Sequence, residues 1–312
     1  MACPPSPRTR FDLVRCIVDR ALPNDRVHSL EILEGGATNL NTLVRLEKCI
    51  EPLVLRTYLH GAHVCQKEVH LLKALQGLVQ VPSLIKSDPT GDEIGTPYLI
   101  YRFISGLTFR QIRANGSPRE MADAAHAIGR CLGSLRRHDI SLFSACRLGP
   151  PFPVTENDLN SPLLRELLGS ADLLLLNALF AKWSQVLGAL AGEESLVHGD
   201  FNHRNIVLDC PNGRWEVAGI LDWELAGTGS CLWDAARFLC YQKPDSDHWE
   251  SHFIDGFRAE SPGTLPGDWK DLRLAMNTLS AAAGLASGTV QERFIPELRR
   301  LVHGGLRGER IG

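Results

Sequence analysis

The hydrophobic periodicity of this chain changes once, near residues 104–108, and that change limits the folds available to it. Before the change, two runs at helical spacing predict helices at 10–22 and 63–76. Short apolar runs bounded by turn residues predict strands there at 30–33, 43–46, 53–57, 83–87 and 97–103. After it, only two short strands are expected, at 206–208 and 217–221. Helices are expected there at about 117–138, 171–191, 232–241, 247–259, 269–286 and 290–303. We therefore expect an α+β fold of two lobes, residues 1–104 and 105–312, with a ligand cleft between them.

Composition excludes several classes of protein. With 44% hydrophobic and 22% charged residues, the chain of 312 residues is globular in composition. The net charge of −3 gives no basic footprint, so we expect no nucleic-acid partner. The first residues lack the apolar core of a signal peptide. The longest apolar stretch, residues 171–183, is interrupted by polar residues and is too short to span a bilayer. We expect a soluble cytoplasmic protein without a membrane or an obligate protein partner.

The nine cysteines do not form a recognisable framework. Their number is odd and no C-x-x-C pair occurs among them. Disulfide scaffolds and zinc ribbons are therefore poor interpretations, and free thiols in a reducing compartment are expected.

The candidate catalytic and metal-binding residues lie between positions 196 and 224. A short apolar run leads into His198-Gly199-Asp200, and Asn205 follows Asp200 by five residues. The two strands expected at 206–208 and 217–221 come next and can pair as a hairpin. One acid therefore precedes the hairpin and another, Asp222, follows it, with the Asn205 amide a short loop away from the first acid.

This segment offers oxygen ligands and a proton acceptor. Asn205 and Asp222 carry the hard oxygen atoms that suit Mg²⁺, which keeps waters and substrate phosphates in its other positions. Asp200 is placed to accept a hydrogen bond from a substrate hydroxyl and to take its proton. Phosphoryl transfer needs mainly positioning and charge neutralisation. Two alternatives stay open: ordinary turn residues that satisfy their own backbone, and a zinc site using His198 and His203.

The pattern His198-Gly-Asp200, Asn205 and Asp222-Trp-Glu resembles the signature of the aminoglycoside phosphotransferase family, which is related to choline, homoserine and, more remotely, protein kinases. Protein kinases keep the same five-residue step but carry His-Arg-Asp and Asp-Phe-Gly. The resemblance covers about residues 30–240. It implies the two-lobed protein-kinase-like fold, with a small antiparallel sheet in the N-lobe and a larger helical C-lobe. It also implies ATP, or GTP in its place, together with Mg²⁺.

The resemblance assigns nucleotide-binding residues to two segments of the first lobe. Gly36, Thr38 and Asn39 lie between two expected strands, in the place of the family's nucleotide loop. The segment matches neither G-x-G-x-x-G nor a Walker A loop, so an ordinary turn is the alternative. The segment 97–106 resembles the hinge, where an adenine would pair with backbone groups near Arg102 and Ile104. A simple buried strand is the alternative there.

Three charged residues have counterparts in the family. Arg56 takes the place of the kinase lysine that holds the α- and β-phosphates, and Glu68 matches its ion-pair partner. A surface helix charge is the alternative for Glu68. Asp234, near the start of a helix, ties down the preceding loop in the family, although its simpler interpretation is a helix cap. Since no Ala-Pro-Glu signature precedes this helix, a regulated protein kinase is disfavoured.

The acceptor is less well defined. Residues 241–272 contain seven acids and three Lys or Arg, which would suit a cationic acceptor such as an amino sugar or amino alcohol, or would simply form a solvated helix face. Trp249, Phe253 and Phe257 recur every four residues, so we expect this side of the helix to pack into the core.

We therefore expect an ATP- and Mg²⁺-dependent phosphotransferase that moves the γ-phosphoryl group to a hydroxyl of a small molecule, with an aminoglycoside or another antibiotic as one acceptor class. A metabolic kinase of the choline, homoserine or sugar type shares every motif quoted. A nucleotide-binding scaffold without catalysis and a protein kinase are further alternatives. Hydrolases are disfavoured, because neither G-x-S-x-G nor H-E-x-x-H occurs.

Overall fold

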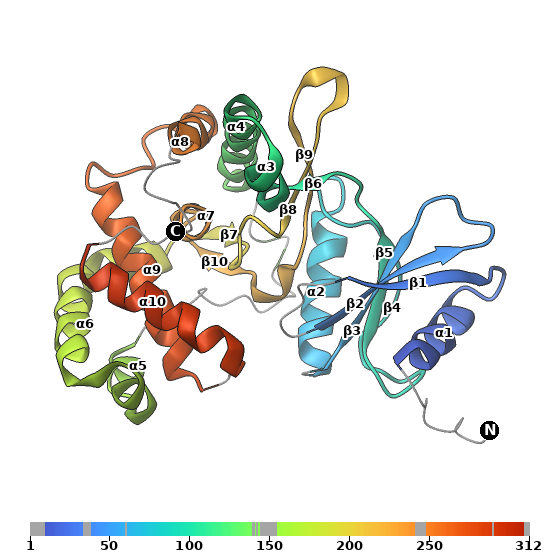
Figure 1. Cartoon of the computed structure of the whole chain (residues 1–312), viewed down its shortest axis with the longest axis horizontal. Coiled ribbons are helices and arrows are strands. Elements are labelled where there is room, and N and C mark those ends of the chain that lie inside the picture. The colour runs from blue at the N-terminus through green and yellow to red at the C-terminus, as the bar shows by residue number, and fades with distance from the viewer. Residues whose placement is uncertain are drawn as a thin grey trace. The chain divides into compact units, whose positions relative to one another are not determined.

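The computed structural model describes residues 10–33, 39–59, 61–138, 141, 143, 155–240, 248–288 and 290–308. The chain forms two compact units, Met1–Ser105 and Gly106–Gly312. The first is built on a sheet and the second is mainly helical (Figure 1).

The N-terminal unit contains a five-stranded antiparallel sheet with the strand order β1-β2-β3-β5-β4. Its strands are β1 (Val27–Leu33), β2 (Asn39–Leu46), β3 (Leu53–Tyr58), β4 (Leu84–Asp88) and β5 (Tyr98–Arg102). Each lies where a strand was expected. The central strand β3 is buried along its whole length, which requires cover on both faces of the sheet.

Two helices cover the sheet, α1 (Arg10–Ala21) and α2 (Ala62–Leu75). On one face, Val14, Ile17 and Val18 of α1 form a core cluster with Leu53 and Leu55 of β3. Because side chains alternate along a strand, the neighbouring residues of β3 point to the other face. There the strand meets α2, whose inner side is buried.

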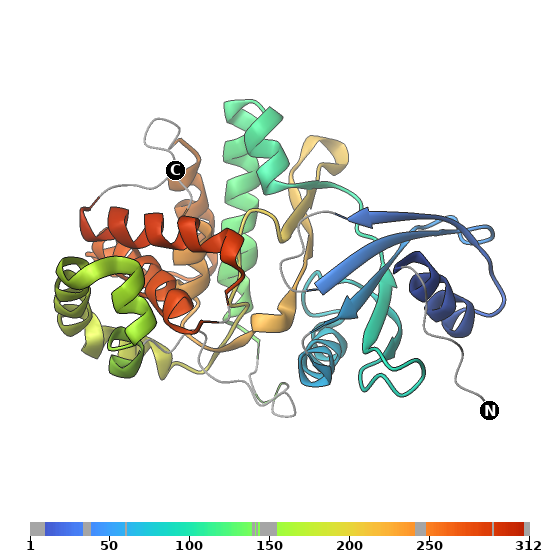
Figure 2. The same cartoon turned by 60° about the horizontal axis from the view of Figure 1, so that its bottom comes forward.

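The C-terminal unit is mainly helical. Its helices are α3 (Phe109–Asn115), α4 (Pro118–Leu135), α5 (Glu156–Leu159), α6 (Pro162–Ala191), α7 (Leu232–Phe238), α8 (His248–Glu260), α9 (Trp269–Ala286) and α10 (Ile295–Leu306). Helices α4 and α8 approach closely because Gly129 and Gly256 lie at their contact, where an added Cβ would overlap the backbone oxygens of Phe253 and His126. Helix α9 packs against α6 and α10 (Figure 2).

Five short strands complete this unit. Strands β6 (Leu107–Thr108), β8 (Ile206–Asp209) and β9 (Glu216–Ile220) form one sheet, and β7 (Ser195–Val197) pairs with β10 (Gly227–Gly229) in another. The β8–β9 hairpin confirms the two strands that the sequence predicts. Strands β6, β7 and β10 were not predicted, since two or three residues are too few to show a period.

Helices α6 and α10 start elsewhere than expected, and the short helices α3 and α5 were not expected. Helix α6 begins at Pro162 rather than 171, and Gly169 interrupts its helical dihedrals with φ 80° and ψ 167°. That interruption separates the first turns from the apolar run that suggests the helix. Helix α10 begins at Ile295 rather than 290, after the 3₁₀ turn Glu292–Phe294. Helix α3, which was not expected, starts at a capping box formed by Thr108 and Gln111.

Among the described residues, α6 is the one helix that is long and apolar enough to cross a membrane by length and composition. It has 30 residues and so extends well beyond the apolar stretch 171–183 from which the sequence expectation was drawn. Core helices of soluble proteins meet the same two criteria, and α6 contacts both α9 and α10. The cytoplasmic location therefore stays a prediction.

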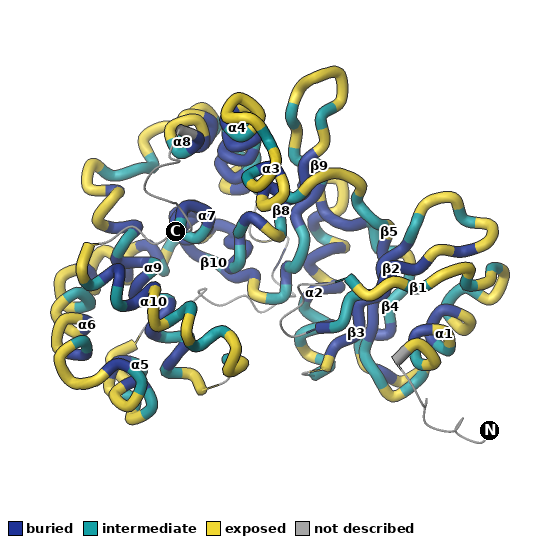
Figure 3. The backbone as a smooth tube through the Cα atoms, viewed as in Figure 1, coloured by how far each residue is buried: buried dark blue, intermediate teal, exposed yellow. Residues whose placement is uncertain are grey.

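The core of the C-terminal unit is rich in aromatic rings. Trp249, Phe253 and Phe257 on α8 are buried, so the predicted inner side of this helix is confirmed. Phe238 of α7 stacks on Phe253, which stacks on Phe257, and the Trp249 ring meets Phe238 edge-on. Helix α7 itself is buried along most of its length (Figure 3). The seven cysteines among the described residues are all free, as expected; Cys3 and Cys146 lie outside that part.

Candidate active site

The loop of residues 198–205 joins β7 to β8, and both ends are fixed by strand pairing. Strand β7 pairs with β10, and β8 pairs with β9 in a register that places Ile206 opposite Ile220. The Leu221 N–H then donates to the Asn205 carbonyl at 2.8 Å. Asn205, which precedes β8, therefore lies at the same end of the hairpin as Asp222, which follows β9.

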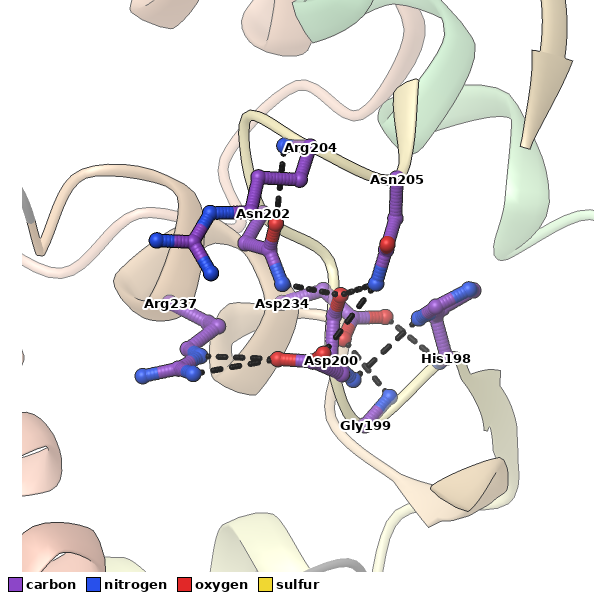
Figure 4. Close-up of polar contacts among 8 residues, drawn as sticks. All are labelled: His198, Gly199, Asp200, Asn202, Arg204, Asn205, Asp234 and Arg237. Atoms are coloured by element: carbon purple, nitrogen blue, oxygen red, sulfur yellow. Dashed lines mark hydrogen bonds and ion pairs between the residues drawn. The ribbon is translucent and has the colours of Figure 1, made fainter. Parts of the chain in front are cut away.

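The Asp200 carboxylate is held through both of its oxygens (Figure 4). Oδ1 accepts hydrogen bonds from Nε and Nη2 of Arg237, each at 3.1 Å, and Oδ2 accepts one from Asn205 Nδ2 at 3.1 Å. The Asp200 carbonyl also accepts from Asn205 Nδ2 at 3.0 Å and from Asn202 Nδ2 at 3.2 Å. The Asp200 side chain nevertheless stays 24% exposed, so a solute hydroxyl can reach it.

Asn205 and Asp222 have the donor set of a magnesium site. An amide that donates through Nδ2, as Asn205 does to Asp200, presents Oδ1 as its acceptor atom. Asp222 adopts a left-handed conformation with φ 69°, which Asp tolerates better than most residues, and it begins the tight 3₁₀ turn Trp223–Leu225. One carboxylate and one amide oxygen at the same end of a hairpin fit a hard cation that also binds phosphates.

Two histidines of this segment have structural roles. The buried His198 accepts the Asp200 N–H at Nδ1 (3.1 Å), and its Nε2 lies 2.9 Å from the Leu221 carbonyl. In the buried His203, Nδ1 meets Arg113 Nη1 at 2.9 Å and Nε2 meets the Phe238 carbonyl at 2.8 Å. A carbonyl can only accept, so Nε2 carries the proton in both rings. With all four ring nitrogens engaged, the zinc interpretation is wrong.

Burial keeps both rings neutral. It lowers the pKa of His198, although Asp200 and Asp222 act in the opposite direction. It lowers the pKa of His203 to about 3, and the Arg113 guanidinium adds to this effect. The two rings therefore serve as fixed hydrogen-bond links between the loop and its neighbours at physiological pH.

Asp234 anchors the start of the loop. Its Oδ2 accepts the His198 N–H at 2.7 Å, and its Oδ1 accepts the Gly199 N–H at 3.0 Å. Asp234 is 1% exposed, and burial raises its pKa to about 7. The helix-cap interpretation is wrong: Cys231 is the N-cap of α7, and no side chain caps it.

Gly199 is required by its surroundings. Its φ of +82° belongs to the left-handed region, and an added Cβ would overlap the Leu225 carbonyl oxygen. The glycine between His198 and Asp200 therefore permits the backbone to pass close to the segment after Asp222.

In the N-terminal unit, Arg56 and Glu68 form a buried ion pair, as the resemblance implies. Arg56 Nε lies 3.4 Å from Glu68 Oε2, and the two side chains are 5% and 4% exposed. Tyr58 completes the group: its hydroxyl donates to Glu68 Oε2, and its ring lies 5.3 Å from the Arg56 guanidinium carbon. The surface-charge interpretation of Glu68 is therefore wrong.

The expected nucleotide loop and hinge are only partly described. Gly36 and Thr38 lie outside the described residues, whereas Asn39 is buried at the start of β2. The Arg102 N–H donates to the Ser83 carbonyl at 3.0 Å, within the sheet. An adenine would therefore have to pair with other backbone groups near Arg102, and the role of this residue stays a prediction. Ile104 follows β5, and the pairing of its backbone with an adenine stays a prediction.

Two of the seven acids in residues 241–272 are neutralised by ion pairs with arginine. Glu250 pairs with Arg273, and Glu260 pairs with Arg130 and Arg137. Three further acids, Asp255, Asp268 and Asp271, are exposed, and Asp245 and Asp247 lie outside the described residues. The described acids thus favour the solvated-face interpretation over a subsite for a cationic acceptor.

Comparison with known proteins identifies the fold. A model of the phosphotransferase enzyme family matches residues 29–273. The structure of the GDP complex of aminoglycoside 2'-phosphotransferase-IIIa is similar with a TM-score of 0.73 and 18% identity, over 96% of this chain and 99% of that one. A microcompartment-associated aminopropanol kinase gives 0.65 and 19%, over 93% and 95%. These similarities confirm the kinase-like α+β fold that the sequence predicts.

Curated relatives are longer than this chain. Acyl-CoA dehydrogenase family member 11 of Gallus gallus is 27% identical over 234 residues, which cover 72% of this chain and 29% of that protein. The Homo sapiens protein of the same name is 28% identical over 227 residues, which cover 70% of this chain and 29% of that protein. The chain thus spans about three tenths of the length of these relatives.

Proposed function

Because the chain belongs to the phosphotransferase enzyme family, we propose that it transfers the γ-phosphoryl group of ATP, or of GTP, to a hydroxyl of a small molecule. In this proposal Asp200 is the catalytic base, and Asn205 and Asp222 bind Mg²⁺. Arg56 contacts the nucleotide phosphates and Glu68 orients it. The observation that carries the proposal is the Asp200 carboxylate, which is held through both oxygens yet stays 24% exposed.

The proposed reaction follows from these contacts. The acceptor hydroxyl donates a hydrogen bond to Asp200, and its oxygen attacks the γ-phosphorus. The new oxygen–phosphorus bond forms as the bond from the γ-phosphorus to the bridging oxygen of the β-phosphate breaks. The nucleoside diphosphate leaves with that oxygen, and the hydroxyl proton passes to Asp200. Mg²⁺, when bound, neutralises charge on the phosphate oxygens. Asn205 holds Asp200 in place throughout.

The acceptor class is proposed from the relatives. Solved structures of similar fold act on aminoglycosides, on an aminopropanol and, in Brachybacterium faecium, on macrolides, by their names. An antibiotic and a metabolic alcohol are therefore both proposed. The curated relatives carry the name of acyl-CoA dehydrogenases. That name supports a metabolic alcohol as the second candidate acceptor.

A product screen tests the proposal. The full chain is incubated with Mg²⁺ and ATP or GTP against kanamycin, streptomycin, a macrolide, aminopropanol, choline, homoserine and simple sugars. Nucleoside diphosphate release is measured, and phosphorylated product is detected by mass. We expect at least one acceptor to gain one phosphoryl group. A chain that binds nucleotide but modifies no acceptor would favour the non-catalytic scaffold, and transfer to peptides alone would favour a protein kinase.

The matched control is Asp200→Ala. We expect this variant to lose about 10²- to 10⁴-fold in turnover, because it lacks the proton acceptor. Its thermal unfolding should stay close to that of the wild type, since the loop keeps its bonds to Asp234 and, through His203, to the Phe238 carbonyl. Wild-type turnover in Asp200→Ala would overturn the assignment of the base.

A further inference from the structure

We infer that Arg237 is a positioning residue for Asp200: its guanidinium fixes the orientation in which the carboxylate meets the acceptor hydroxyl. No sequence motif points to this residue, which is 37 positions from its partner. The inference rests on the proposed function, since the orientation of Asp200 matters for turnover only if Asp200 is the base.

Arg237 and Asn205 hold the Asp200 carboxylate from two sides. Arg237 binds Oδ1 through two nitrogens, Nε and Nη2, each at 3.1 Å, from helix α7. Asn205 binds Oδ2 from the loop itself. Rotation of the carboxylate about its last bond would break contacts on both sides, so its plane is defined. Hydrogen bonds between a guanidinium and a carboxylate are charge-assisted and strongly directional.

Hydrogen bonds hold the backbone on both sides of Arg237. The carbonyl before it, that of Ala236, accepts a hydrogen bond from Asn277 Nδ2 at 2.8 Å. The carbonyl after it, that of Phe238, contacts His203 Nε2 at 2.8 Å. The backbone on either side of Arg237 is therefore tied to α9 and to the catalytic loop. Such support is what a group needs if it is to hold another group in a reactive geometry.

Stability alone does not explain this pair. Arg237 and Asp200 are 31% and 24% exposed, and ion pairs that reach solvent contribute little to folding. The loop has its own anchors in Asp234 and His203, which are buried and do not involve Arg237. The contact therefore acts on the orientation of Asp200 more than on the presence of the loop.

The test compares Arg237→Ala, Arg237→Lys and Arg204→Met with the wild type, using the acceptor that the wild type phosphorylates best in the screen. Arg204 is a matched control, because it is an exposed cation of the same loop whose backbone N–H, and not its side chain, donates to Asn202. We expect Arg237→Ala to lower kcat by about 10- to 100-fold, with the KM values for nucleotide and acceptor within about twofold. Arg237→Lys should recover part of kcat, and Arg204→Met should resemble the wild type.

Chemical rescue separates positioning from folding. Millimolar guanidinium chloride should raise the kcat of Arg237→Ala severalfold, whereas sodium chloride at the same ionic strength should not. Unchanged kcat in Arg237→Ala, a rise in the acceptor KM alone, or a loss of kcat that follows a lowered Tm and resists guanidinium would each overturn the inference. Failure of the proposed function is distinct: the wild type would then yield no product, or Asp200→Ala would remain active.

Discussion

The two units treat their central ion pairs in opposite ways. In the N-terminal unit, Arg56 and Glu68 are 5% and 4% exposed and lie between a sheet and a helix. In the C-terminal unit, Arg237 and Asp200 are 31% and 24% exposed, and the loop around them is anchored by other groups. A buried charge that loses its partner is costly, whereas water replaces the partner of an exposed one. Loss of a partner in the first pair should therefore lower stability as well as activity. Loss of Arg237 from the second pair should lower activity with little effect on stability.

Tyr58 strengthens the first pair as a unit. Its hydroxyl donates to Glu68, and burial together with the nearby Glu68 charge raises the pKa of the tyrosine well above its usual value. The tyrosine thus remains a neutral donor at physiological pH. Arg56 and Tyr58 both contact the buried Glu68 carboxylate, so the removal of Glu68 takes a partner from both side chains.

The largest effect is expected from Glu68→Gln. This change removes the Glu68 charge from beside the buried Arg56 guanidinium, and we expect it to reduce the free energy of unfolding by about 3–5 kcal/mol. Urea unfolding, followed with hydrogen exchange of α2 to identify the unit affected, measures the loss. The double variant Arg56→Met/Glu68→Gln is the control, because it removes the buried charge as well and should recover much of the loss. A loss of unfolding free energy smaller than that of Asp200→Ala would contradict the comparison of the two ion pairs.

Asp234→Ala should have the next largest effect. The His198 and Gly199 amides would lose a buried acceptor that is 1% exposed, which costs about 2–4 kcal/mol for the two groups. Turnover should fall as well, because the loop that carries Asp200 loses its anchor. Asp234→Asn keeps one acceptor oxygen and should lie between this variant and the wild type. Equal stability of wild type and Asp234→Ala in urea would show that the loop is held elsewhere.

The third prediction concerns pH. The folded pKa of His203, about 3, lies below its unfolded value of about 6.5, so the unfolded chain binds more protons between these two values. Its contribution to stability is therefore complete above about pH 6.5 and is lost on acidification, by about 1.4 kcal/mol per pH unit. Asp234, with a pKa raised to about 7, acts in the opposite direction, because its neutral form is favoured in the folded state.

A difference measurement isolates the histidine. The variant His203→Gln lacks the titrating ring but retains Asp234, so the gap between its unfolding free energy and that of the wild type should narrow as the pH falls from 6.5 to 4. Chemical denaturation at a series of pH values records that gap. A gap that stays constant over this interval would mean that the ring is already protonated, or solvated, in the folded protein.

Local patterns made much of the fold and part of the candidate site predictable. The five strands of the first sheet and the β8–β9 hairpin contain short apolar runs bounded by turn residues, and the candidate catalytic segment keeps Asp200, Asn205 and Asp222 within 23 positions. Because the hairpin register fixes Asn205 beside Asp222, a spacing along the chain becomes a distance in space. Predictions of this kind depend on contacts between near neighbours in sequence.

Contacts over longer separations were not predictable from one sequence. The bonds from Asp234 and Arg237 to the loop of residues 198–205 span 35 to 37 positions. The resemblance points to Asp234 as an anchor of the loop before α7 and not of this loop, and no motif points to Arg237. Strand β10, with two glycines in three residues, has no apolar pattern to read. Other signals were present but were overlooked: Thr108 with Gln111 marks the start of α3, and Ser161 followed by Pro162 marks the start of α6.

Gly199 limits which residue can stand between His198 and Asp200 in this chain. Protein kinases place arginine between the His and Asp of the same motif. In this chain that exchange would force a side chain onto the Leu225 carbonyl and a left-handed backbone onto a residue that disfavours it. An arginine at position 199 would thus require the stretch after Asp222 to move away from the 198–200 backbone.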